Sequence, residues 1–475
     1  MAESRLNITD YSSLDTRLEE LAENINAMFL LFNAMIVSLM QAGFACLEAG
    51  CVNSKNVTNI IMKNVLDLFI CGIFYWLVGY SLAYSPGNMF LGYTLWAGVG
   101  MPEGRLAHWF FQFVFAATAA TILSGAVAER CNFAAYIVYS SVISGFVYPV
   151  VAHWAWAEGG LLAEMGYRDF AGSGVVHALA GVCSLVAAAF IGPRTGRFQN
   201  GVAVEKPGHS IPLMGLGGLL LISGFLAFNG GSLGHITEPG DGEIVARSIM
   251  NSIMAGSGAA VVILALCKLG LVGPSTWAFS TTLNATLAGI VSVCAGVDVF
   301  SPLGAIISGA CACLVYLLFR FLVLYVKVDD PLDAVAVHLG GGLWGLISFP
   351  LFARGGIVYG VNGQSIAQLW HNLVGAIIIM VWSAICSVIL FGILRVTGYL
   401  RVSEEQELEG LDIAMHNEPA YPAKGWTQAH SLQTVDQQTY QKHGSYTLNQ
   451  SHLSARPTLA FDNMALELDN RQRQR

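Results

Sequence analysis

Two histidines, His177 and His338, lie in the interior of long apolar blocks of the sequence. Neutral imidazole carries one hydrogen-bond donor and one acceptor nitrogen, so two facing rings can share a hydrogen bond and still present a polar edge to a pore. Such a pair can pass a proton or hold a small amine. A single histidine inside a membrane is about as often a packing residue as a functional one, and we interpret His108 and His153 as packing residues. Two histidines at matching positions instead favour a functional pair.

The matching positions come from a faint internal repeat. Residues 174–181 (GVVHALAG) resemble residues 334–341 (AVAVHLGG), and each segment follows an aspartate, Asp169 or Asp333, by a few residues. With five apolar blocks per half, the second copy must enter the membrane from the opposite side. Inverted repeats place their functional site near the bilayer midplane, where the halves meet. The sequence therefore predicts that the two histidines meet there.

The elements that must position these histidines are membrane-spanning helices. The chain of 475 residues is 55% hydrophobic and only 11% charged, whereas a soluble domain carries about 25% charged residues. Its apolar blocks are about twenty residues long, enough to cross a hydrocarbon core of about 30 Å. We predict an all-α polytopic membrane protein with eleven transmembrane helices, arranged as an inverted 5+5 repeat plus one long C-terminal helix. The expected spans are 25–48, 60–84, 108–128, 133–157, 170–192, 211–230, 244–268, 273–295, 302–326, 334–353 and 368–398.

Several classes of function fit this composition poorly. The ten cysteines form no CxxC pair and nearly all lie in or beside apolar blocks, so they predict small buried side chains rather than disulfides or a metal site. The sequence contains no metal-ligand cluster, nucleotide-binding loop or nucleophile elbow, and its glycine-rich stretches are typical of helix packing. We therefore expect no enzyme, no cofactor, no metal and no nucleic-acid partner.

The distribution of Lys and Arg predicts the orientation. If the N-terminus is extracellular, eleven Lys and Arg residues lie at cytoplasmic ends of spans and six lie outside, which favours this orientation and a cytoplasmic C-terminus. The sequon Asn7–Thr9 is then accessible to glycosylation, so we expect a glycoprotein, whereas the sequon Asn284–Thr286 lies within a span.

Several motifs resemble those of one family. Residues 40–50 (MQAGFACLEAG), followed by SKN at 54–56 and MKN at 62–64, resemble the first-span signature of the Amt branch of the Amt/Mep/Rh ammonium transporters. Residues 169–177 (DFAGSGVVH) are similar to the family signature. The later matches are Asp329-Asp330-Pro331 with Asp333 and His338, and Gly410-Leu411-Asp412 with His416, Ala420 and Tyr421. The resemblance covers about residues 25–421 in the family's order.

The resemblance implies a multi-pass plasma-membrane protein that takes up ammonium or methylammonium from one side of a lipid bilayer, as a homotrimer with one pore per subunit. It implies a recruitment site at Phe115, Trp156 and Ser232, where aromatic faces attract a cation and the hydroxyl accepts a hydrogen bond from ammonium but not from potassium. It also implies that Phe115 and Phe228 stack to close a dry pore. Ammonium would shed its proton at the entrance, and ammonia and the proton would cross separately, the proton through His177 and His338.

The resemblance assigns Asp169 as a site organiser, although capping of the fifth span is an equally good interpretation. It marks Gly410, Asp412 and Tyr421 as parts of a regulatory tail. We divide the chain into four parts: an extracellular N-terminal segment (1–24), an eleven-helix transporter domain (25–398), a cytoplasmic regulatory segment (399–423) and a disordered cytoplasmic tail (424–475).

The sequence departs from the family pattern at three places. The sixth span reads FLAFNGGS at 225–232 instead of an aromatic-rich run, which predicts a reshaped outer vestibule. Cys294 stands where many relatives carry threonine, which removes a hydroxyl acceptor. Ala414 replaces the threonine that is phosphorylated in plant members, so regulation at that position should be absent.

Two alternatives to net ammonium uptake stay open. One is electroneutral conduction of ammonia, as in the Rh branch, although Phe115 and Trp156 favour the Amt branch. The other is an ammonium sensor, in which occupancy of the pore moves the segment 401–421 and signals to a partner.

Overall fold

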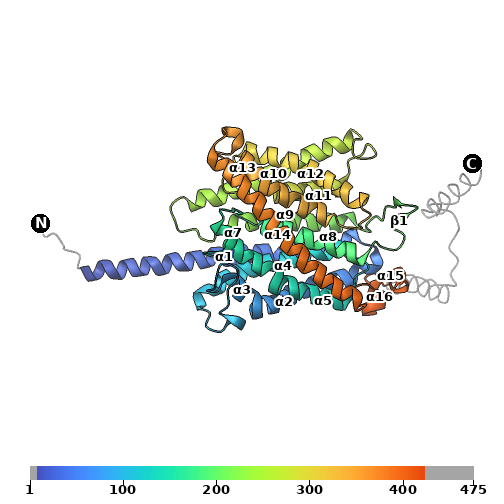
Figure 1. The fold of residues 1–475 in the computed structure, drawn as a ribbon, viewed down its shortest axis with the longest axis horizontal. Helices are drawn as coiled ribbons and strands as arrows, with labels where there is room; N and C mark the ends of the chain where they lie inside the picture. Colours follow the sequence, from blue (N-terminus) through green and yellow to red (C-terminus); the bar gives the residue numbers. More distant parts are fainter. Residues whose placement is uncertain (1–7, 423–475) are drawn as a thin grey trace, which may run out of the picture. The chain divides into compact units, whose positions relative to one another are not determined.

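The structure is a computed structural model that describes the backbone of residues 8–422 and the side chains from Leu14 onward. The described chain is almost entirely helical (Figure 1). Its α-helices are α1 (Ile8–Cys51), α2 (Val57–Phe74), α3 (Tyr80–Tyr84), α4 (Leu106–Ala126), α5 (Phe133–Val142), α6 (Tyr148–Trp156), α7 (Leu161–Glu164), α8 (Leu179–Ile191), α9 (Ile211–Gly231), α10 (Asp241–Lys268), α11 (Phe279–Val291), α12 (Pro302–Tyr325), α13 (Gly341–Phe352), α14 (Gly363–Val396), α15 (Glu404–Glu409) and α16 (Leu411–His416). Two short strands, β1 (Phe198–Gln199) and β2 (Val202–Ala203), pair antiparallel.

Within residues 8–422, four π-helical turns interrupt or begin the spans. They are η2 (Tyr75–Gly79), η5 (Ile143–Val147), η6 (Ser173–Ala178) and η7 (Val335–Gly340). A π turn leaves one backbone carbonyl outside the regular ladder and is frequent at functional sites. Because η6 and η7 contain the two histidines, these turns lie where the sequence predicts the site.

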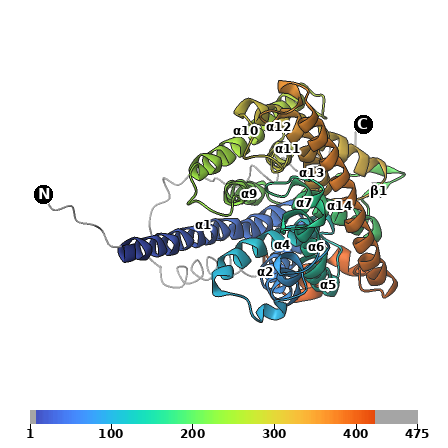
Figure 2. The same cartoon turned by 60° about the vertical axis from the view of Figure 1, so that its left-hand side comes forward.

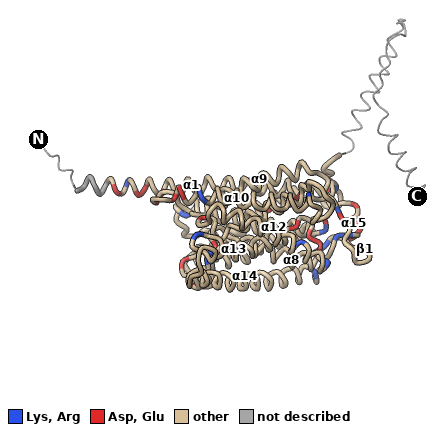
Figure 3. Tube along the Cα trace, turned by 90° about the horizontal axis from the view of Figure 1, so that it is seen from above, with Lys and Arg blue, Asp and Glu red and all other residues tan. Residues whose placement is uncertain are grey.

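The prediction of a polytopic membrane protein is confirmed. In the described chain, ten helical segments are long and apolar enough to cross a membrane. Most Lys, Arg, Asp and Glu residues lie toward the two ends of the bundle, and few lie in the middle (Figure 3). We call the end at which α1 begins the N-terminal face, and the end at which α14 stops and α15 and α16 pack the C-terminal face.

Two helices differ from the predicted spans. Helix α1 begins at Ile8 rather than near residue 25, because a hydropathy pattern detects the apolar part of a helix and not its polar extension. Helix α11 has only 13 residues, because the chain leaves the helix after Val291 and continues as buried turns through residues 292–299. Non-helical backbone is tolerated at this depth when protein surrounds it. The apolar block 273–295 is therefore a short helix with a buried turn.

The two halves of the bundle pack reciprocally. The turn η6 contacts α13, η7 contacts α8, and the two turns touch each other. The chain runs in opposite directions through them: α8 ends at the C-terminal face, where the carbonyl of Ile191 accepts a hydrogen bond from Arg401. The loop before η7 starts at that same face, where Asp329 pairs with Arg194, and α13 ends beside Phe300. Helix α1 lies along α9, and α14 packs against α8 and α13 (Figures 1 and 2). The described fold is therefore built from inverted halves, as the histidine repeat predicts.

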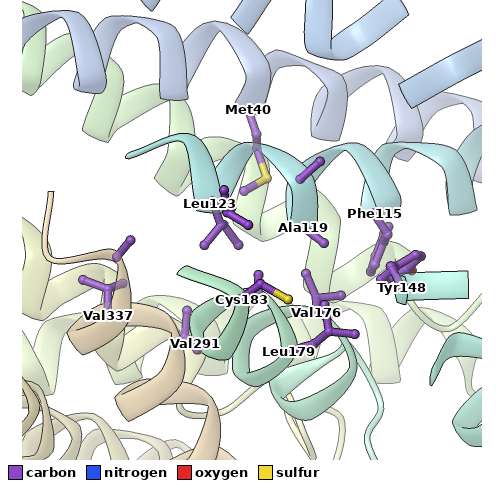
Figure 4. Packing of buried hydrophobic residues seen from close by; sticks show 14 of the residues in the cluster. Met40, Phe115, Ala119, Leu123, Tyr148, Val176, Leu179, Cys183, Val291 and Val337 are labelled. Atoms are coloured by element: carbon purple, nitrogen blue, oxygen red, sulfur yellow. The ribbon is translucent and has the colours of Figure 1, made fainter. Parts of the chain in front are cut away.

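Small and large apolar side chains fill the interface between α4 and the segment formed by η6 and α8, which carries His177. Phe115, Ala119 and Leu123 of α4 face Val176 of η6 and Leu179 of α8 in the buried interior (Figure 4). Residues 115, 119 and 123 recur every four positions and so share one face of the helix. This close packing fixes η6, and with it His177, against α4.

Candidate functional site

The two histidines meet in the centre of the bundle. Nδ1 of His177 lies 3.2 Å from Nδ1 of His338, and the ring planes are 18° from parallel with centroids 5.2 Å apart. His177 is fully buried and His338 is 7% exposed. Since one nitrogen must donate and the other accept, the rings share one proton between them. Nε2 of His177 is buried and has no hydrogen-bond partner among the described residues, so it can meet a small polar molecule.

Asp169 fixes the position of the turn that carries His177. Its carboxylate accepts hydrogen bonds of 2.7 to 3.0 Å from four successive backbone N–H groups, those of residues 172–175. Gly172 adopts a left-handed conformation at φ 94°, which lets the chain wrap around the carboxylate. The Tyr167 hydroxyl donates to the same carboxylate at 3.0 Å. Asp169 thus caps the start of the helix, which is one of the two interpretations that its position in the sequence allows.

The equivalent of Asp169 in the second half is Asp330, and the sequence pairing of Asp169 with Asp333 needs this correction. Asp330 precedes His338 by eight residues, as Asp169 precedes His177, and its carboxylate accepts the Val335 N–H at 2.7 Å. Asp333 instead accepts the Tyr316 hydroxyl at 2.7 Å and the Asn284 amide at 3.3 Å. Because the repeat is faint, it identifies equivalent aspartates in the two halves only to within a few residues.

The structure brings Phe115, Trp156 and Ser232 to the same pocket on the N-terminal face. The pocket has a volume of about 260 Å³, and its wall also includes Leu30, Tyr84, His108, Phe111, Gln112, Phe170, Leu233 and Gly234. The Trp156 ring stands at 83° to that of Phe115, with centroids 6.2 Å apart. The Ser232 hydroxyl donates to the Phe228 carbonyl at 2.7 Å, so its lone pairs are directed elsewhere and can accept.

Phe115 and Phe228 stack at the bottom of this pocket. Their centroids are 4.0 Å apart, their planes differ by 15°, and both side chains are buried. The Phe228 ring lies 5.6 Å from the His177 ring. The two phenyl rings therefore lie between the pocket and His177.

Phe225 and Cys294 do not lie where the departures from the family pattern led us to expect. Phe225 is one helical turn beyond Phe228, 5.6 Å from His177, and lines a cavity on the far side of the histidines rather than the outer vestibule. Cys294 is buried, and its carbonyl accepts the Ala171 N–H at 2.9 Å. It is not among the described residues that line the outer pocket.

Tyr84, His108 and Gln112 are residues with polar side chains in the wall of the outer pocket that were not predicted to lie there. His108 has a polar partner, because its Nδ1 lies 3.0 Å from the Tyr80 hydroxyl. A signal existed, since residues 108, 112 and 115 recur at helical spacing and share one face of α4. His153, by contrast, is held between the carbonyls of Ala83 and Asn88 at 2.9 and 2.7 Å, which fits a packing residue.

The segment that follows α14 is bound to the C-terminal face. Asp412 caps α2 by accepting the Asn59 N–H at 2.9 Å, and His416 Nε2 lies 2.9 Å from the Asn59 side-chain amide. Gly410, at φ 113°, allows α16 to turn onto this face beside Lys55. Tyr421 lies at the end of the described chain and is 55% exposed. The sequon residue Asn7 and the predicted disordered tail, 424–475, lie outside the described residues.

A buried ion network joins the loops of both halves at this face. Arg194 bonds Asp329 at 2.7 Å and also contacts Glu129. Burial alone would raise the pKa of Asp329, but hydrogen bonds from Arg194 and the charges of Arg130 and Arg194 lower it below its usual value. Burial and the charge of Asp333 raise the pKa of Asp330 to about 7. The network fixes the loop before η7 relative to the loop after α8.

Comparisons with known proteins agree with this geometry. Residues 27–421 match the model of the Ammonium Transporter Family. The chain is 44% identical to a provisionally named ammonium transporter 1 of Caenorhabditis elegans, over 86% of this chain and 82% of that one. It is 38% identical to ammonium transporter 1 member 3 of Solanum lycopersicum, over 84% of this chain and 94% of that one.

Solved structures share the fold. A protein named "Sensor Amt Protein" superposes with a TM-score of 0.78 at 31% identity, covering 84% of this chain and all of that one. The crystal structure of Candida albicans Mep2 superposes with a TM-score of 0.72 at 22% identity, covering 81% of this chain and 87% of that one. The chain therefore belongs to the ammonium transporter family and is a multi-pass membrane transporter rather than an enzyme.

Proposed function

We propose that this protein takes up ammonium by binding it in the outer pocket, removing a proton, and conducting ammonia and the proton separately past the histidine pair. The observation that carries the proposal is the sequence of three features along one line: a pocket with aromatic walls, the Phe115–Phe228 stack, and His177 sharing a hydrogen bond with His338.

The pocket suits a small cation that donates hydrogen bonds. The faces of Phe115 and Trp156 attract a cation by about 0.5 to 2 kcal/mol, depending on how far it is desolvated. Ser232 offers lone pairs to an N–H group, which potassium lacks. Ammonium is therefore favoured over potassium of similar size.

The conduit beyond the pocket favours ammonia over the intact ion. Phe115 and Phe228 close the approach to His177, and Phe225 lies on the far side of that ring, so an ion in these apolar surroundings loses its hydration without compensation. The histidine pair provides a separate route for the proton, because its shared hydrogen bond can be donated from either ring.

Uptake of ammonium or methylammonium by a yeast strain without its own permeases tests the proposal. We expect His177→Ala and His338→Ala to lose uptake or selectivity, since each removes one half of the shared hydrogen bond. His153→Ala is the matched control, because His153 is a buried histidine whose ring nitrogens contact the carbonyls of Ala83 and Asn88 and not the other two histidines. Wild-type uptake in both pore variants would contradict the proposal.

The transport mode is tested by voltage clamp. We propose the electrogenic mode, in which ammonium evokes an inward current. Absence of current together with intact uptake would favour the electroneutral, Rh-like alternative.

We further propose a homotrimer in the plasma membrane with the N-terminal face outside. Apolar side chains such as Met28 on α1, Val261 on α10 and Ile389 on α14 are more than half exposed in the single chain, so lipid or other copies must cover them. Native mass spectrometry should give three copies per particle, and protease accessibility of an epitope after residue 422 should place the C-terminus inside the cell.

A sensor function is the second candidate. The solved relative with 31% identity is named as a sensor, and the docked segment of this chain reaches α2 through Asp412 and Asn59. Deletion of residues 424–475 should leave uptake intact and abolish a downstream ammonium response if the protein signals. A response that survives the deletion would contradict signalling through the tail.

A further inference from the structure

A small cavity lies on the C-terminal side of the histidine pair. Its volume is about 30 Å³, which is room for about one water molecule. Of the described residues in its wall, the polar ones are His338, Glu48 and Asn284, and the rest are apolar or small. A carboxylate and a histidine of the conduit thus share one water-sized space.

This cavity adjoins a larger one at the C-terminal face. Asn284 and Leu332 line both, and the second cavity has a volume of about 290 Å³ with Asp330, Asp333 and Arg320 in its wall. The small cavity therefore lies between the histidine pair and the larger cavity at this face.

Glu48 is held in the cavity wall by two hydrogen-bond donors. The Asn64 side-chain amide donates to Oε2 at 3.1 Å, and the Ser124 hydroxyl donates to Oε1. The side chain is 1% exposed, and Lys63 and Asp67 are the other charged groups that act on it from α2. A buried carboxylate needs such partners.

Ser124 can serve Glu48 in both of its protonation states. The hydroxyl carries one hydrogen but has two acceptors in reach, Oε1 of Glu48 and the Thr121 carbonyl at 2.8 Å. If Glu48 gains a proton, its O–H can donate to the Ser124 oxygen while the Ser124 hydrogen turns to Thr121. Neither the carboxyl nor the hydroxyl is left without a partner in either state.

We propose that Glu48 is the proton acceptor on the exit side of the conduit, reached from His338 through one water in the shared cavity. The inference rests on the proposed function. Ammonium gives one proton to the histidine pair; His338 passes a proton to the water, and the water passes one to the Glu48 carboxylate. Glu48 then releases its proton back into the shared cavity, from which it passes Asn284 to water in the larger cavity. Only N–H and O–H bonds form and break, and ammonia leaves separately.

The test is ammonium-evoked current from protein reconstituted in liposomes. Glu48→Gln keeps the shape, and its amide can accept from Asn64 and donate to the Ser124 oxygen while that hydroxyl donates to Thr121. It cannot accept the proton, and we expect current to fall about 100-fold or more. Glu48→Asp retains the carboxylate and should recover at least about one tenth of the wild-type current. Asp241→Asn is the matched control, because Asp241 is a buried acid paired with His235 that neither lines the described cavity nor acts on Glu48, and its current should stay near wild type.

Equal currents in Glu48→Gln and the wild type would overturn the assignment, as would equal losses in Glu48→Gln and Glu48→Asp, which a purely structural role predicts. If Glu48→Gln does not fold, Ser124→Ala is the deciding variant. We expect it to lose about tenfold in current at an unchanged half-saturating ammonium concentration. Unchanged current in Ser124→Ala would overturn the inference. A wild-type protein that moves ammonia without current would instead refute the electrogenic function on which the inference rests.

Discussion

The indole N–H of Trp156 donates to the backbone carbonyl of Asp169 at 2.7 Å. The aromatic wall of the outer pocket is thereby joined to the residue that caps the His177 turn. Cation binding and the position of the histidine thus depend on one hydrogen-bonded unit.

Replacing Trp156 should weaken binding. Loss of a cation–π contact of about 0.5 to 2 kcal/mol corresponds to a rise of about 2- to 30-fold in the half-saturating ammonium concentration for Trp156→Ala. Trp154→Ala is the control, because Trp154 bonds the Phe90 carbonyl and packs on Trp382 outside the pocket. Concentration-dependent uptake measures both, and an equal change in the two variants would contradict the role of Trp156.

Asp169→Asn should destabilise the protein. An amide has only one acceptor oxygen for the four N–H groups that the carboxylate now accepts. Hydrogen bonds to a charged group contribute about 1.5 to 3 kcal/mol each, so the melting temperature of the detergent-solubilised protein should fall. Asp298→Asn, at a partly exposed ion pair with Arg168, should change it less.

Opening the phenyl stack should make the conduit leak. Phe228→Ala removes one of the two stacked rings that separate the outer pocket from the histidines, and we expect a potassium current that the wild type lacks. Phe113→Ala removes a ring from another stack, with Trp109 at 5.5 Å, away from the conduit. It should lower stability without a potassium current, and a leak in this variant alone would refute the gate.

The ion network at the C-terminal face should give the fold an acid limit. The pKa of Asp329 is lower in the folded chain than in the unfolded one. Its contribution to the free energy of unfolding is therefore complete above the usual aspartate pKa and is lost as pH falls through the lowered value. Asp329→Asn should lower the melting temperature at pH 7. As the pH is lowered, the melting temperature of this variant should fall less than that of the wild type. Asp15→Asn, at an exposed position on α1, should leave the thermal profile unchanged.

Uncapping α2 tests the docked segment. Asp412→Ala leaves the Asn59 N–H without its acceptor, and loss of a cap costs about 0.5 to 2 kcal/mol. We expect residues 404–416 to exchange amide hydrogens faster while the spans keep their protection. Glu404→Ala is the control, because Glu404 is exposed in the same segment. Unchanged exchange in Asp412→Ala would show that other contacts hold the segment.

Sequence pattern predicted most of the fold, because a membrane requires apolar helices of a set length and their hydropathy is visible locally. The extent of α1 and α11 was not visible, because neither a polar helical extension nor a buried turn changes the apolar pattern in a characteristic way. The pairing of His177 with His338 followed from the repeat. His108 and Gln112 were missed, because sharing a helical face with Phe115 does not by itself show that this face lines a pocket.

By itself the sequence determined the membrane class, the inverted halves and the two histidines, since composition, block length and a repeated motif are local properties. Only the tertiary structure decided that Asp330 rather than Asp333 caps the second turn, that Phe225 lies beyond the histidines, and that Glu48 shares a cavity with His338. These relationships depend on which faces of distant helices meet, and packing between α1, α9 and the second half decides that.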